Sequence, residues 1–158
     1  MSNMDEIRDF FRANKDLEPV NNPKDRDYDL VETPCEIDGI PVIREWEQGK
    51  GSKLIFSRLD SCLGLVWVIE EEMQGIHFSQ VFDDNMTDET NSKITLDSIV
   101  GSSDTLYAFG GSCSTWKEDY DKIKNLGVNP LEGGDVGQKR WLVELDEMGI
   151  PKLTEIPD

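Results

Sequence analysis

The run Cys62-Leu-Gly-Leu-Val-Trp-Val-Ile69, followed by Glu70-Glu71-Glu72, decides the fold of this chain. It is the longest unbroken apolar run in an acidic, mostly polar sequence. Apolar residues at successive positions, rich in β-branched and aromatic types, are typical of a strand that is buried on both faces. The run is too short to cross a membrane. We therefore expect residues 62–69 to form the central strand of a sheet, with the rest of the chain packed against it.

The segments around this run predict further strands joined by hairpins. Asp38-Gly39 separates Cys35–Ile37 from Ile40–Trp46, and this dipeptide is a strong signal for a two-residue hairpin turn. Turns are also expected where glycine interrupts the pattern, at residues 48–52 and 74–75. Residues 93–100 fit either a strand or a helical turn. Further strands are expected at residues 53–59, 76–82, 106–109, 140–145 and 150–156.

Two helices complete the expected architecture. In the first, over residues 4–14, one face carries the apolar side chains Met4, Ile7, Phe10 and Phe11. The second is expected near residues 115–126 and ends before a glycine. We expect an α+β fold with a single antiparallel β-sheet-rich domain over residues 1–158. Residues 1–34 would form the N-terminal helix and an irregular connection, and residues 35–158 the sheet-rich core.

The charge balance restricts the classes of partner. The chain has 33 Asp and Glu against 16 Lys and Arg, a formal net charge of −17. Such a surface repels nucleic acid and anionic lipid, so we expect neither direct nucleic-acid binding nor membrane binding. It favours basic protein partners, although solubility alone can also account for an acidic surface.

The cysteines and the N-terminus favour a reducing compartment. Cys35, Cys62 and Cys113 are an odd number at wide spacing, without a metal-like pattern around the single His77. Residues 1–6 have neither the basic start nor the apolar core of a signal peptide. We expect a cytoplasmic protein with free thiols, no metal and no cofactor.

One cluster suggests catalysis. Cys113 lies in Gly110-Gly-Ser-Cys-Ser114, between an expected strand and an expected helix, where the helix dipole would lower the pKa of a thiol. A cysteine-dependent enzyme using Cys113 with His77 as base is therefore one alternative. The same residues also suit a tight strand–helix turn. The acidic stretch 25–36 approximates a calcium loop but has Leu30 where the loop needs glycine.

The favoured hypothesis is binding. Acidic side chains near expected loop tips, with aromatic residues beside them, are suited to capturing a basic protein, because charge speeds association and an aromatic residue anchors the complex. We expect a bacterial immunity-type inhibitor of a toxin, such as a nuclease; a protein that mimics DNA is another alternative. The expected partner-binding residues are Asp83, Asp84, Asp88, Glu89, Trp116, Glu118, Asp119 and Tyr120.

Overall fold

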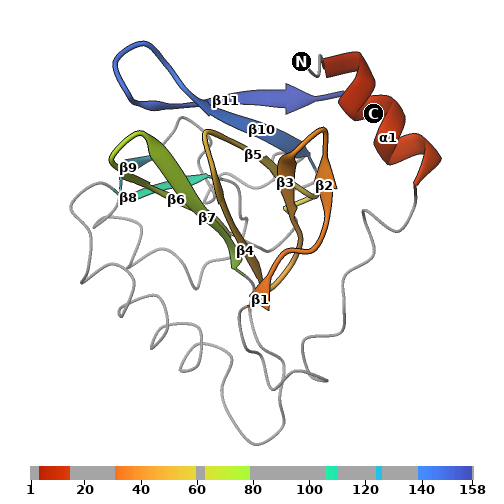
Figure 1. The fold of residues 1–158 in the computed structure, drawn as a ribbon, viewed down its shortest axis with the longest axis horizontal. Helices are drawn as coiled ribbons and strands as arrows, with labels where there is room; N and C mark the ends of the chain where they lie inside the picture. Colours follow the sequence, from red (N-terminus) through yellow and green to blue (C-terminus); the bar gives the residue numbers. More distant parts are fainter. Residues whose placement is uncertain are drawn as a thin grey trace, which may run out of the picture.

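The structure, a computed structural model, describes residues 4–14, 31–59, 63–78, 106–109, 124–125 and 139–157 (Figure 1). These residues form mostly β structure with one N-terminal helix. The elements are α1 (Met4–Ala13), β1 (Val31–Glu32), β2 (Glu36–Ile37), β3 (Ile40–Ile43), β4 (Glu47–Gly51), β5 (Lys53–Phe56), β6 (Leu63–Ile69), β7 (Glu72–Phe78), β8 (Leu106–Phe109), β9 (Lys124–Asn125), β10 (Arg140–Leu145) and β11 (Pro151–Ile156).

The strands form two mixed sheets, so the expectation of a single antiparallel sheet is wrong. One sheet has the order β1-β4-β7-β6-β8-β9 and the other the order β11-β10-β5-β3-β2. Most neighbours are antiparallel, but β1 with β4, β8 with β9, and β3 with β5 are parallel. The chain changes sheets twice in quick succession, because β3 and β5 belong to one sheet while the intervening β4 belongs to the other.

The sheet that contains β5 is the middle layer of the described structure. Alternate residues of a strand point to opposite faces, and in β5 both faces are covered. Leu54 and Phe56 join the core cluster shared with Val66 and Phe109 of the other sheet. Ile55 joins a second cluster with the buried side chains of α1. The layers are therefore α1, the sheet containing β5, and the sheet containing β6 (Figure 1).

In the sheet containing β6, the central strand lies where the sequence predicts it. β6 pairs with β7 on one side and with β8 on the other. Leu65 and Val66 are fully buried, but Trp67 is only half-buried and Ile69 is 44% exposed. Burial on both faces is thus confirmed for Gly64–Val66 only, among the described side chains of the run. The strand reaches the molecular surface at its second half.

The hairpin predicted at Asp38-Gly39 is confirmed. Ile37 pairs with Ile40, and the two turn residues have φ values of 49° and 81°. Positive φ at both central residues is the signature of the hairpin turn that matches strand twist, and glycine adopts it without steric cost. The C-terminal hairpin is confirmed as well, since β10 and β11 pair along their whole length, from Arg140 with Ile156 to Leu145 with Pro151.

Two expected turns are wrong. Residues 48–51 are part of β4, and Gln74 and Gly75 lie inside β7. The actual turn between β6 and β7 is Glu70-Glu71, where Glu70 has a φ of 60°. Gly75 serves close packing instead. A Cβ placed there would lie 2.8 Å from side-chain atoms of both Leu54 and Phe56 of the facing sheet.

The helical predictions are correct in part. The first helix is confirmed as α1, whose Ile7 and Phe11 are buried; Phe10, expected on the same face, is 41% exposed. Of the second expected helix, residues 124–125 form β9, parallel to β8, and residues 115–123 and 126 lie outside the described residues. The expected irregular connection contains β1, so strand structure begins before residue 35. Residues 93–100 also lie outside the described residues.

Candidate functional site

All eight residues expected to bind the partner lie outside the described residues, as do Cys62 and Cys113. They are Asp83, Asp84, Asp88, Glu89, Trp116, Glu118, Asp119 and Tyr120. Of the other chemically reactive residues named from the sequence, the structure describes Cys35 and His77. Trp46, at the end of the strand expected over residues 40–46, is only 2% exposed. It therefore belongs to the core.

The described strands have two contrasting ends, and the first contains buried polar groups. At the turn from β3 to β4, the carboxylate of Glu47 is 1% exposed and accepts hydrogen bonds from Arg44 through the backbone nitrogen, Nε and a terminal guanidinium nitrogen, each at 2.9 Å. A two-pronged pair of this kind neutralises both charges and fixes their geometry. Trp46 within this turn has a φ of 61°. The ion pair thus stabilises an unusual corner where the chain crosses between sheets.

His77 belongs to the same end. It is 1% exposed, its Nε2 donates to the carbonyl oxygen of Arg58 at 3.1 Å, and its ring stacks on Phe56 with a centroid distance of 6.5 Å. Burial lowers the pKa of His77 to about 4, because the charged imidazolium would lose its hydration. Hydrogen bonds to backbone carbonyls and the nearby charge of Glu47 oppose this shift without cancelling it. His77 is consequently neutral at physiological pH.

The thiol that the structure describes is poorly suited to nucleophilic chemistry. Cys35 is a free, half-buried cysteine. Burial raises the pKa of its thiol, opposed by the positive charge of Arg44. Since the thiolate is the reactive form, the thiol of Cys35 is mostly protonated at neutral pH. Among the described residues, the end with the buried Arg44–Glu47 pair therefore contains neither a reactive thiol nor a charged histidine.

The opposite end of the sheets consists of three turns that lie together. The turn from β4 to β5, the hairpin turn Glu70-Glu71, and the loop from Asp146 to Ile150 all occur here (Figure 1). Their proximity follows from the strand register, since Gly51 pairs with Met73 of β7 and Lys53 pairs with Glu144 of β10. Ion pairs link the strands at this end, with Lys50 and Glu72 3.7 Å apart and Lys53 and Glu144 3.8 Å apart.

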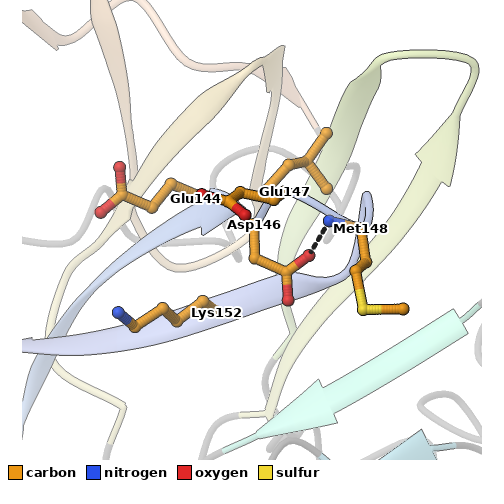
Figure 2. A pocket seen from close by; sticks show the side chains of 6 residues that line it. Glu144, Asp146, Glu147, Met148 and Lys152 are labelled. Carbon is orange, nitrogen blue, oxygen red and sulfur yellow. Dashed lines mark hydrogen bonds between the residues drawn. The ribbon is translucent and has the colours of Figure 1, made fainter.

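The loop between β10 and β11 has a defined conformation. One oxygen of Asp146, Oδ1, accepts hydrogen bonds from the backbone nitrogens of Met148 at 2.8 Å and Ile150 at 2.9 Å (Figure 2). Two backbone hydrogen bonds close the same loop, from Asp146 to Ile150 and from Gly149 to Asp146. An aspartate at the start of a turn commonly stabilises it in this way.

This ordered loop exposes apolar side chains. Met148 is 82% exposed and Ile150 41%, and Ile69 on the neighbouring hairpin is 44% exposed. An open hollow of about 540 Å³ lies beside the loop. Figure 2 shows side chains that line it. Its described lining is Glu144, Leu145, Asp146, Glu147, Met148 and Lys152.

The same turns and the strand ends beside them carry carboxylates. Glu70, Glu71, Asp146 and Glu147 are exposed, and Glu144 is half-buried. We call this group of three turns, with its exposed apolar residues and its carboxylates, the acidic end. Sequence reasoning identified the β10–β11 hairpin of this end but misplaced the turn between β6 and β7, and it did not select the acidic end as the binding surface. The available signal was Met148, an apolar residue placed between a glutamate and a glycine in a turn.

Among the described residues, no group of three or more histidine, cysteine, aspartate or glutamate side chains is arranged to hold a metal ion. None of the described helices has the length and apolar character needed to cross a membrane. Neither observation concerns the residues outside the described ranges.

Comparison with known proteins found no family model, no curated protein and no solved structure that matches this chain.

Proposed function

We propose that this chain is a small acidic cytoplasmic protein that binds and neutralises a basic protein partner. The observation that carries this proposal is the acidic end, where an ordered loop exposes Met148 and Ile150 among carboxylates. The net charge of −17 adds long-range attraction for a cationic protein. Charge raises the rate of association, and buried apolar contacts slow dissociation.

A toxin with a cationic active site is the partner class that this chemistry fits best. Nucleases present positive surfaces to phosphate, and an acidic inhibitor competes for that surface. We therefore propose, more specifically, that the chain is a bacterial immunity-type inhibitor of such a toxin. A protein that mimics DNA would share the charge, but exposed apolar side chains such as Met148 fit a protein–protein interface better.

The alternative of a cysteine-dependent enzyme has less support. It requires His77 to accept a proton from Cys113. Nε2 of His77 donates to the carbonyl oxygen of Arg58, and Nδ1 is buried without a hydrogen-bond partner among the described residues. With a pKa of about 4, this imidazole is a weak base. These observations favour a structural role for His77.

The test uses the full chain to capture basic proteins from its source cells at low salt, followed by purification of each captured protein. The chain should inhibit the enzymatic activity of its partner, which for a nuclease is the cleavage of DNA or RNA. The association rate should fall steeply as salt rises, because exposed charges are screened beyond about 8 Å at physiological ionic strength. An unrelated protein of equal net charge serves as the control. Equal inhibition by this control, or a salt-independent association rate, would contradict the proposal.

The residues expected from the sequence give a second set of variants for the same assay. Asp83→Lys with Asp84→Lys, or Glu118→Lys with Asp119→Lys, should mainly slow association. Trp116→Ala should speed dissociation and weaken binding by about 2 kcal/mol or more if Trp116 is an anchor. The stability of Trp116→Ala must be measured alongside, since loss of a buried tryptophan would weaken folding and binding together.

A further inference from the structure

The acidic end differs from the rest of the described surface in how strongly it exposes an apolar side chain. Met148 is 82% exposed, whereas the other large exposed apolar residues described, Phe10, Ile69 and Ile150, are between 41% and 44% exposed. An exposed apolar side chain does not contribute the stabilisation of about 25 cal/mol per Å² that burial of its surface would give to the folded chain.

We propose that the loop from Asp146 to Ile150 is the docking element of this protein, with Met148 as its apolar anchor. The occupant is a basic protein that presents an apolar depression rimmed by lysine or arginine. This inference rests on the proposed function and specifies the part of the surface that performs it. It assigns Asp146 the role of positioning residue and leaves contact with the partner to Met148 and the surrounding carboxylates.

The conformation of the loop supports this assignment. An interface residue held in place before binding loses less conformational entropy when the complex forms. Oδ1 of Asp146 binds the backbone nitrogens on both sides of Gly149, those of Met148 and Ile150. Gly149 itself has a φ of 76°, a conformation suited to glycine. The loop therefore presents the Met148 side chain from a fixed backbone.

The side chain of Met148 suits an anchor. Methionine is unbranched and has a polarizable thioether, so it adapts to irregular apolar depressions. Figure 2 shows this side chain extending from the tip of the loop, with Lys152 farther along β11. Because the Met148 side chain is adaptable and the loop backbone is ordered, Met148 can fit a partner without reorganisation of the loop.

Charge complementarity identifies the occupant. Glu147 precedes Met148 in the loop, Glu70 and Glu71 follow Ile69 in the hairpin turn, and all three are exposed. Two of the lysines at this end, Lys50 and Lys53, already lie within 4 Å of Glu72 and Glu144. Lys152 lines the same hollow as Met148, but the carboxylates of Glu144, Asp146 and Glu147 line it too, so the net charge around Met148 is negative. A cationic rim around an apolar depression matches it, while an acidic partner would be repelled.

The test measures the methyl signals of the five methionines in the full chain by NMR, with methyl-labelled methionine. The probe is a short peptide with a Leu-Trp pair between arginine pairs. One matched peptide replaces Leu-Trp by Ser-Ser, and another replaces the arginines by glutamines. The Met148 methyl signal should shift on addition of the probe, while that of Met73, which is fully buried, should stay in place. Both matched peptides should bind at least about tenfold more weakly.

Variants separate the anchor from the loop. Met148→Ser should weaken probe binding at least about tenfold, and Met148→Leu should restore most of it. Asp146→Asn keeps an oxygen that accepts both backbone hydrogen bonds and should lose only the effect of one charge. Asp146→Ala removes the acceptor, so it should weaken binding beyond Asp146→Asn. An equal effect of the two Asp146 variants would overturn the positioning role.

The outcomes distinguish this inference from the proposed function. If the Leu-Trp and Ser-Ser peptides bind equally and the Met148 signal does not move, the docking inference fails, while inhibition of a captured basic partner can still stand. If neither arginine peptide binds even at low salt, the docking inference and the attraction for basic partners fail together. If partner inhibition is absent but the probe binds through Met148, the surface is correctly identified and the inhibitory function is wrong.

Discussion

The ion pairs at the two ends of the β layers differ in how far they are exposed to water. At one end, Arg44 and Glu47 are withdrawn from water, with side chains 11% and 1% exposed, and meet in a two-pronged pair. At the other, Lys50 and Glu72 are about half exposed and 3.7 Å apart. Withdrawn charges depend on each other, because a lone buried charge is very unfavourable, whereas exposed charges are stabilised by water. We infer that the first end maintains the fold and that the second is free to meet a partner.

The largest expected effect is at the buried pair. Arg44→Met leaves the Glu47 carboxylate buried without its guanidinium, which should lower the free energy of unfolding by about 3–5 kcal/mol. Lys50→Met, at the acidic end, should lower it by less than about 1 kcal/mol. Urea unfolding of both variants measures the contrast. Similar losses for the two would show that the ends do not differ in the way proposed.

The next effect is a dependence of stability on pH that comes from His77. Its pKa is lowered from 6.5 to about 4 in the folded state, so the unfolded chain binds a proton in this range that the folded chain does not. Neutral His77 therefore makes its full contribution to the free energy of unfolding above pH 6.5. This contribution is lost as the pH falls towards 4, by about 1.4 kcal/mol per pH unit.

A titration-free variant isolates this contribution. His77→Gln retains a side-chain donor for the carbonyl oxygen of Arg58 but does not titrate. Between pH 6.5 and pH 5 the original chain should lose on the order of 2 kcal/mol more stability than this variant. Parallel curves for the two proteins, from urea unfolding at each pH, would mean that His77 is accessible to protons in the folded state.

A smaller effect is expected in the loop of the acidic end. Asp146→Ala removes the acceptor for the backbone nitrogens of Met148 and Ile150 and should cost about 1 kcal/mol. Amide hydrogen exchange at these two positions should accelerate in Asp146→Ala and remain near the original rate in Asp146→Asn. Unchanged exchange in both variants would indicate that the other loop contacts are sufficient to order it.

The smallest effect on stability is expected for the proposed anchor. Because Met148 is 82% exposed, Met148→Ser should change the free energy of unfolding by no more than about 0.5 kcal/mol. The same variant should weaken binding strongly, so thermal unfolding and probe binding should be measured on one preparation. A clear loss of stability would place Met148 within the core rather than at an interface.

Local sequence signals predicted the elements whose causes are local. The turn Asp38-Gly39 contains the residues that its positive φ values require. The periodicity of apolar residues predicted α1. The β10–β11 hairpin was predicted from its two strand patterns and from the turn residues between these strands. Strand β6 was found from its apolar run, and its pairing on both sides agrees with the expected central position.

The remainder depends on contacts between residues distant in sequence. Gln74-Gly75 resembles a turn, but Gly75 occupies a strand where Leu54 and Phe56 approach too closely for a Cβ. Conversely, Glu70 begins a turn with positive φ although it is not a glycine. Strand β5 is only four residues long and starts with a lysine, so nothing local shows that both its faces are covered. The division into two sheets has no local signal either.

The position of β10 has a consequence for synthesis of the chain. This strand lies between β5 and β11 in the middle layer, and Trp141 pairs with Phe56, which is made far earlier. At about 5–20 residues per second on a ribosome, the edge of β5 waits several seconds for its neighbour. An unpaired apolar edge can pair wrongly with other chains during that interval. Chaperone binding to the nascent chain would therefore be concentrated on residues 53–56, and release should coincide with emergence of residues 140–145.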